Sequence, residues 1–215
     1  MINIILDDKF KNKYYYMLVT KKAPEFSATA VMPNNEINEN FSLYENFGEN
    51  GTVLFFYPLD FTFVCPTEII AFNHRLDEFK KRDINVIGVS IDSHFSHLAW
   101  KSTDVNNGGI GQIKYPLVAD LTKSIARDFD VLIEDVGVSL RGSFLIDKDG
   151  TVRHSVINDL PLGRNIDEML RMVDTMLFTN EHGEVCAAGW SSGDEGMTAT
   201  TEGVADYLTK HKTEL

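Results

Sequence analysis

The chain has 215 residues, of which 43% are hydrophobic and 24% are charged, and its formal net charge is -12 at pH 7. This length and composition are typical of one compact globular domain with a sizeable buried core. Only 20 lysines and arginines stand against 32 acids, so no basic face is expected for a phosphate backbone, and we set nucleic acid aside as a partner.

The sequence gives no sign of a membrane span or a secretory signal. No apolar run approaches the roughly 18–20 residues that a bilayer-spanning helix needs. The short apolar piece at residues 2–6 precedes Lys9, Lys11 and Lys13, which is the reverse of the order in a signal peptide. We therefore expect no membrane partner and a cytoplasmic protein. Residues 1–16 are interpreted as an N-terminal extension, either upstream of a natural start at Met17 or as an ordinary arm.

The cysteine content limits the chemistry that the chain can support. Two cysteines are too few for a disulfide-stapled secreted fold, and they cannot complete a structural zinc site without several histidines. The remaining alternatives are inert core thiols and redox chemistry. We expect neither a metal nor another cofactor.

A strand-helix-strand unit is predicted around the first cysteine. Residues 52–57 form a continuous apolar and β-branched run, which is typical of a strand buried on both faces. Pro66 starts a helix that reaches about residue 82 and carries an apolar side chain at every third or fourth position. Residues 84–91 form a second apolar strand, so a right-handed parallel crossover is expected.

Two short helices and a hairpin are predicted next. The expected ranges are 94–103 and 120–129 for the helices, and 143–146 with 151–157 for the hairpin strands. Asp120 is placed to cap the first turn of the second helix. The turn signal Asp147-Lys148-Asp149-Gly150 separates the two strands and favours an antiparallel pairing.

The last predicted helix follows Asn165, which forms a capping pair with Glu168 and precedes apolar side chains that trace one face as far as Leu177. Residues 187–201 are rich in glycine, serine and threonine, so we expect them to be mobile. Together these elements predict a central mixed sheet with helices on both sides.

The position of Cys65 indicates a reactive thiol. It lies between the loop after a buried strand and a helix that starts at Pro66, so its sulfur should face the unpaired amides and the positive dipole end of that helix. This location favours the thiolate, which is the nucleophilic form. Thr62 lies one helical turn earlier, where its hydroxyl can donate to the sulfur or orient a substrate oxygen. The alternative for Cys65 is a buried cysteine that acts as a small hydrophobic residue. The alternative for Thr62 is a simple local cap.

Beyond these local signals, residues 58–65, Pro-Leu-Asp-Phe-Thr-Phe-Val-Cys, resemble the peroxidatic signature Pro-x-x-x-Thr-x-x-Cys of the peroxiredoxins. The continuation through Pro66-Thr67-Glu68 is similar to the typical two-cysteine group that includes the peroxidase component of bacterial alkyl hydroperoxide reductase and the thioredoxin peroxidases. Other segments resemble the same group in the same order, namely residues 92–93, 97–101, 108–111, 140–142, 158–164 and 183–186. The resemblance covers about residues 18–208.

The resemblance implies a thioredoxin-like α/β fold, with a central mixed sheet flanked by helices. Residues 17–178 would form the peroxidase domain, and residues 179–215 would form a C-terminal arm that carries the second cysteine. The implied reaction is the reduction of hydrogen peroxide and organic hydroperoxides. In it, Cys65 attacks the terminal peroxide oxygen, while Thr62 and Arg141 hold the peroxide and stabilise charge. A guanidinium suits this role because its charge is permanent and its donors are fixed, although Arg141 taken alone would be a surface charge.

Three supporting residues are implied in the same way. Pro58 would shield the sulfur from water, and Glu68 and Arg164 would form the pair that orients Arg141. Without the resemblance, Pro58 is a strand terminator, Glu68 is an acid in the first turn of a helix and Arg164 is a residue before a cap.

The second cysteine, Cys186, is the only thiol that can capture a Cys65 sulfenic acid before more peroxide oxidises it irreversibly. The resemblance implies a disulfide between Cys65 of one chain and Cys186 of its partner in an antiparallel homodimer, with dimers often assembling into a decamer. The implied electron donor is thioredoxin or a flavoprotein disulfide reductase. Ala187 stands where the group usually has proline, so the resolving segment is expected to be looser.

Two further segments resemble features linked to easy overoxidation, Gly108-Gly109-Ile110-Gly111 and Tyr207-Leu208. A tail packed over the Cys65 helix would slow the local opening that a disulfide needs, which gives a second peroxide more time. Because the sensitive members more often end in Tyr-Phe, we expect intermediate sensitivity.

Three other interpretations remain open. A cysteine hydrolase would use His154 and Asn158 beside Cys65. A metal site at His182 and Cys186 would have only two ligands. A redox relay or holdase chaperone on the same fold would pass disulfides to other proteins without turning over peroxide.

Overall fold

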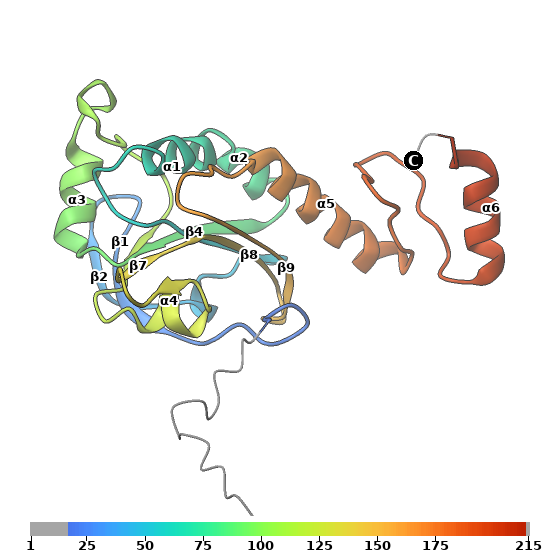
Figure 1. The fold of residues 1–215 in the computed structure, drawn as a ribbon, viewed down its shortest axis with the longest axis horizontal. Helices are drawn as coiled ribbons and strands as arrows, with labels where there is room; N and C mark the ends of the chain where they lie inside the picture. The colour runs from blue at the N-terminus through green and yellow to red at the C-terminus, as the bar shows by residue number, and fades with distance from the viewer. Residues whose placement is uncertain (1–16, 214–215) are drawn as a thin grey trace, which may run out of the picture.

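The computed structural model describes residues 17–213, which fold around a seven-stranded sheet in the order β2-β1-β5-β4-β3-β8-β9 (Figure 1). The strands are β1 (Ser27–Val31), β2 (Ile37–Ser42), β3 (Gly51–Phe56), β4 (Ile84–Ser90), β5 (Leu117–Ala119), β8 (Arg141–Asp147) and β9 (Val152–Asn158), and β6 (Leu132–Ile133) pairs with β7 (Val138–Ser139) in a small second sheet. The helices are α1 (Cys65–His74), α2 (Leu76–Lys80), α3 (His94–Ser102), α4 (Ser124–Asp128), α5 (Ile166–His182) and α6 (Thr201–His211).

The sheet contains both parallel and antiparallel pairs, which confirms the predicted mixed sheet. Strand β3 pairs with β4 in parallel, as the strand-helix-strand prediction requires, and β4 pairs with β5 in parallel. Strands β8 and β9 form the predicted antiparallel hairpin, and β8 also pairs antiparallel with β3. The central position of β3 explains its continuous apolar sequence, because both of its faces are covered.

Two hydrophobic clusters lie on opposite faces of β3. Val53, Phe55 and Tyr57 belong to the cluster that includes apolar side chains of α1, α2 and α5, whereas Leu54 and Phe56 belong to the cluster that includes those of α4. This division follows from the two-residue period of a strand, which sends successive side chains to opposite faces. The two clusters together fix the end of β3, from which the Cys65 loop leaves the sheet.

Two helix predictions need correction. The helix expected from Pro66 to residue 82 bends at Arg75, where φ is -101° and ψ is 4°, and so divides into α1 and α2. The bend lets the apolar stripe follow the twisted sheet: α1 packs beside Phe55, and α2 contacts β4. The helix expected from Asp120 begins only at Ser124, although the Asp120 carboxylate still accepts hydrogen bonds from amides of the first turn.

The capping pair before α5 is confirmed for one of its two members. The Asn165 side chain accepts hydrogen bonds from the amides of Asp167 and Glu168. The Glu168 side chain does not complete the reciprocal bond, because both of its oxygens accept from Arg171.

Beyond α5, the chain forms an arm that extends away from the sheet (Figure 1). Helix α5 runs to His182, past residue 178, where the border of the arm was predicted. The segment expected to be mobile, residues 187–201, packs against α5 at one point, since Trp190 is 3% exposed and its ring lies 4.8 Å from that of Phe178. Helix α6 was not predicted, and the structure shows no buried residue in it. Within residues 17–213, no helix is long and apolar enough to cross a membrane.

Helix α3 carries a buried lysine that ties it to the β1–β2 turn. Lys101 is fully buried, and its Nζ donates a 2.7 Å hydrogen bond to the Met32 carbonyl. No acid pairs with it among residues 17–213. Burial penalises its charged form and lowers the pKa of Lys101 from 10.5 to about 8.

This lysine predicts a stability change at alkaline pH. Between pH 8 and 10.5 the unfolded chain keeps the Lys101 proton that the folded chain has lost, so the cost of burying the charged lysine is removed and the fold becomes more stable as pH rises. The free energy of unfolding of the wild type, relative to Lys101→Met, should increase by about 2–3 kcal/mol across this window. Urea unfolding of both proteins at pH 7.5 and 10, at one concentration, measures the difference. The exposed Lys80→Met serves as control, and equal pH dependence in all three proteins would contradict the prediction.

Candidate active site

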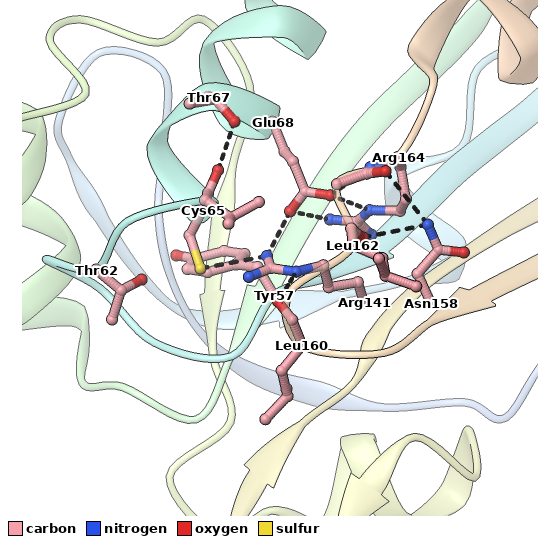
Figure 2. A network of polar contacts seen from close by, with 12 residues as sticks. Tyr57, Thr62, Cys65, Thr67, Glu68, Arg141, Asn158, Leu160, Leu162 and Arg164 are labelled. Carbon is pink, nitrogen blue, oxygen red and sulfur yellow. Dashed lines mark hydrogen bonds and ion pairs between the residues drawn. The ribbon is translucent and has the colours of Figure 1, made fainter.

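Cys65 is the first residue of α1, which begins directly after the loop that leaves β3. It is only 1% exposed, and Pro66 occupies the first turn, where a missing amide hydrogen costs the helix nothing. The sulfur therefore lies where the sequence placed it, at the positive end of a helix dipole. Its side chain points toward the cluster of charged groups shown in Figure 2.

Arg141 is the polar group that contacts the sulfur. It is the first residue of β8, and its Nη1 lies 3.4 Å from Cys65 Sγ. The same Nη1 donates a 2.6 Å hydrogen bond to Glu68, and Nε donates a 2.7 Å bond to the Leu160 carbonyl. Only 4% of the side chain is exposed. The guanidinium is therefore fixed in a buried position beside the sulfur. Arg141 is not the surface charge that its local sequence alone would suggest.

Glu68 joins Arg141 to a second buried arginine. Its Oε1 accepts hydrogen bonds from the amide and Nε of Arg164 at 3.0 and 2.8 Å, and its Oε2 accepts one from Arg164 Nη2 at 3.0 Å (Figure 2). Arg164 also donates to the Gly142 carbonyl and the Ser143 hydroxyl. The Glu68 and Arg164 side chains are 1% and 2% exposed. Two arginines and one carboxylate leave this cluster with one unbalanced positive charge, which faces Cys65.

The two remaining predicted residues lie in the loop between β3 and α1. Pro58 is buried two positions after the end of β3, and Thr62 is half-buried. The Thr62 hydroxyl donates a 2.8 Å hydrogen bond to the Leu59 carbonyl. Because its proton is directed there, its oxygen is left as an acceptor and not as a donor to sulfur. Of the two roles considered from sequence, donation to the sulfur is not seen, because the hydroxyl donates to the Leu59 carbonyl instead.

A buried polar cluster that holds this loop escaped the sequence analysis. Asp60 accepts a 2.9 Å hydrogen bond from the Tyr57 hydroxyl and lies 2.8 Å from His97 Nδ1. His97 Nε2 faces the Val118 carbonyl at 3.2 Å, so each ring nitrogen lies beside an oxygen acceptor. Burial and the Asp60 charge raise the pKa of Tyr57 well above its ordinary value. The sequence signal that could have revealed this cluster was Asp60, an acid in a mostly apolar loop.

The structure does not bring the second cysteine to this site. Cys186 is a free thiol that follows α5, on the arm that Figure 1 shows extending away from the sheet, whereas Cys65 is the first residue of α1. Burial raises the pKa of the Cys186 thiol, the Arg171 charge opposes that rise, and Glu184 adds to it. A Cys65–Cys186 contact within one chain would need the arm to leave its position on α5.

The cysteine hydrolase and metal-site interpretations receive no support from this geometry. His154 lies on β9 beside a cavity of about 400 Å³, and the Asn158 amide donates to the carbonyls of Leu162 and Gly163. The polar partner of Cys65 is an arginine, which cannot act as a general base. Within the described residues, no group of three or more histidine, cysteine, aspartate and glutamate side chains forms a metal site.

Known proteins that resemble this chain are peroxiredoxins and alkyl hydroperoxide reductases. Residues 19–155 match the model of the AhpC/TSA family, and residues 176–210 match that of the C-terminal domain of 1-Cys peroxiredoxin. Alkyl hydroperoxide reductase C of Helicobacter pylori is 63% identical over 199 residues, which cover 93% of this chain and all of the relative. The barley (Hordeum vulgare) protein named 2-Cys peroxiredoxin BAS1, chloroplastic, is 50% identical over 91% of this chain and 92% of its own.

Solved structures of related proteins have the same fold. The reduced 2-Cys peroxiredoxin of Plasmodium vivax has a TM-score of 0.87 and 46% identity, and the match covers 90% of this chain and all of that one. The AhpC structure from Enterococcus faecalis has a TM-score of 0.72 and 36% identity, with coverage of 79% and 99%. These similarities confirm the predicted thioredoxin-like fold.

The charge cluster predicts a large stability loss when its acid is neutralised. Glu68→Gln leaves two buried guanidinium groups without a countercharge, which should lower the free energy of unfolding by about 3–5 kcal/mol. Denaturant unfolding at fixed protein concentration measures the change. Glu78→Gln, at a surface acid that pairs with Lys81 and Arg82, is the matched control and should change stability little. Equal effects of the two substitutions would refute the proposed dependence on Glu68.

Proposed function

The chain belongs to the AhpC/TSA family of peroxiredoxins, and on that basis we propose that it is a thiol-dependent peroxidase that reduces hydrogen peroxide and organic hydroperoxides. The single observation that carries the proposal is the Arg141 guanidinium, 3.4 Å from the Cys65 sulfur at the start of a helix. A fixed cation and a helix dipole together stabilise a thiolate and the negative charge that develops on a departing oxygen.

In the first step, the Cys65 thiolate attacks the terminal oxygen of the hydroperoxide. The S–O bond forms as the O–O bond breaks, and the departing alkoxide or hydroxide takes up a proton and leaves as alcohol or water. Arg141 supplies positive charge beside the attacking sulfur and, in the proposed mechanism, beside the departing oxygen. The Thr62 oxygen, whose own O–H donates a hydrogen bond to the Leu59 carbonyl, accepts a hydrogen bond from the hydroperoxide O–H and so aligns the O–O bond. Pro58 limits water, while Glu68 and Arg164 hold Arg141 in place.

In the second step, Cys186 of the partner subunit attacks the Cys65 sulfenic acid and releases water, which yields an intersubunit disulfide. One observation supports a partner: the arm after α5, the part of the chain that carries Cys186, extends away from the sheet of its own chain (Figure 1). Because the sulfur is only 1% exposed, the start of α1 must open locally before a thiol can reach it.

Two surfaces support assembly into a homodimer and then a decamer. Strand β9 is an edge of the sheet, so its outer backbone groups are open to pairing with a second copy, and Ile157 on it is 45% exposed. The second surface lies at the carboxyl ends of the parallel strands, each of which is followed by a large exposed apolar side chain. These are Phe61 after β3, Phe95 after β4 and Leu121 after β5.

The electron donor is proposed to be thioredoxin or a flavoprotein disulfide reductase, acting in the cytoplasm. A dithiol protein is required because the disulfide product must be reduced before the next turnover. Coupled assays with NADPH and thioredoxin, or with NADH and a flavoprotein reductase, distinguish the two donors. The alternative, a redox relay or holdase on the same fold, is not favoured, since the guanidinium beside Cys65 serves chemistry at that sulfur.

Turnover of peroxide tests the proposed function. Cys65→Ser should abolish peroxide consumption with a thiol reductant, because a serine hydroxyl stays protonated at neutral pH and is a far weaker nucleophile. Cys186→Ser should still form the Cys65 sulfenic acid, trapped with a dimedone probe and detected by mass spectrometry. One stoichiometric oxidation of the wild type without turnover would instead support the relay, and full activity of Cys65→Ser would exclude the peroxidase mechanism.

Sensitivity to overoxidation is a separate expectation. Within one chain α6, with Tyr207 and Leu208, lies on the arm and away from α1, so any cover over Cys65 must come from the arm of a partner subunit (Figure 1). We expect sulfinic Cys65 to appear in the wild type at a moderate excess of peroxide. The Cys186→Ser variant has no resolving thiol, so it should be overoxidised at a lower excess and serves as the most sensitive reference. Mass spectrometry after graded peroxide measures both, and an absence of sulfinic acid at large excess would reject the expectation.

A further inference from the structure

Arg171, on the face of α5 toward the arm, is not used by the peroxide site. Its guanidinium is held by Glu168, whose two oxygens accept from Nε and Nη2 at 2.7 Å each. Its remaining nitrogen, Nη1, donates a 2.6 Å hydrogen bond to the carbonyl of Trp190 on the arm. One rigid, charged fork thus joins the helix to the segment that follows Cys186.

Trp190 anchors the arm at the point that Arg171 contacts. Its ring packs 4.8 Å from that of Phe178, and its indole nitrogen donates to the Asp194 carbonyl at 3.1 Å. Its amide donates to the Ala187 carbonyl at 3.2 Å, which closes a tight turn directly after Cys186. Since Ala187 has no ring to restrict the backbone, this turn depends on its contacts, and the bond from Arg171 is the charged one among them.

The Arg171 charge also acts on the thiol itself. The charged groups that affect Cys186 are Arg171 from α5 and Glu184 from the arm; the first lowers the pKa of the thiol and the second raises it, in addition to the rise caused by burial. Removal of Arg171 therefore leaves burial and Glu184 unopposed, and a smaller fraction of Cys186 is thiolate at a given pH.

We propose that Arg171 is a positioning residue for the resolving step, which fixes the turn after Cys186 from which this thiol attacks the oxidised Cys65 of the partner subunit. This role rests on the proposed peroxidase function. In that step the Cys186 thiolate forms the S–S bond, the S–O bond of the sulfenic acid breaks, and the hydroxide takes up one proton and leaves as water. Arg171 takes no part in the first step, because no contact joins it to Cys65 or Arg141 in the part of the chain that the structure describes.

Single-turnover kinetics of Arg171→Gln and Arg171→Lys test this assignment. Reduced protein is mixed with one equivalent of hydrogen peroxide, quenched at intervals, and analysed by mass spectrometry for sulfenic acid, disulfide and sulfinic acid. For Arg171→Gln we expect an unchanged rate of sulfenic acid formation, disulfide formation slower by about tenfold, and a pH midpoint of the disulfide step moved upward. Arg171→Lys keeps the positive charge but cannot form all the guanidinium hydrogen bonds to Glu168 and Trp190. Its pH midpoint should therefore be closer to that of the wild type than its rate of disulfide formation is.

Arg75→Gln is the matched control, because Arg75 also pairs with an acid of α5, Asp167, but within residues 17–213 it forms no hydrogen bond or ion pair with the arm. Disulfide rates and pH midpoints of Arg171→Gln that equal those of Arg75→Gln would overturn the role of Arg171. This result is distinct from failure of the proposed function, in which the wild type itself forms no sulfenic acid at Cys65. Thermal unfolding of each variant excludes loss of fold, and Arg171→Lys supplies the readout if Arg171→Gln does not fold.

Discussion

The buried carboxylate of Glu68 is the group on which the arrangement of the site depends. It lies one turn after Cys65 on α1, and it binds arginines from β8 and from the loop before α5. Neither guanidinium is a stable occupant of an apolar interior without it, because the desolvation of an unpaired ion costs several kcal/mol. The same ion pairs join three segments that are remote in sequence, so the stability of the fold and the position of the Arg141 guanidinium have one physical cause.

Local features of the sequence were sufficient to place the proposed nucleophile at the start of a helix. A strand buried on both faces and a proline in the first helical turn put Cys65 at a helix N-terminus, and β3 with α1 has this form. Contacts between distant segments were beyond local patterns. Nothing in the spacing of residues 68, 141 and 164 indicates that they meet, and this expectation came from family resemblance. The contact between Asp60 and His97 was missed because a loop and a helix 37 residues apart form it.

The predictions were least complete in the arm. Residues 187–201 have the composition of a mobile segment, yet Trp190 is buried by packing on α5. Helix α6 begins at Thr201, after Thr200, whose hydroxyl caps the amide of Gly203. Val204, Tyr207 and Leu208 have helical spacing, a signal that the sequence analysis did not use, but none of them is buried. An isolated arm would have little to stabilise it, since short helices without tertiary packing are marginal in water. Its contacts with α5 are what define its path.

The unbalanced charge of the Glu68 cluster has a consequence for the timing of the reaction. In the thiolate form that we propose for the attack on peroxide, Cys65 balances this charge and favours a closed start of α1 over Arg141. Oxidation to a neutral sulfenic acid removes this counterion and leaves a solvent-poor cation, which is more stable when water is admitted. Loss of the negative charge therefore weakens the closed arrangement at the moment when the second thiol needs access, and reduction of the disulfide restores it.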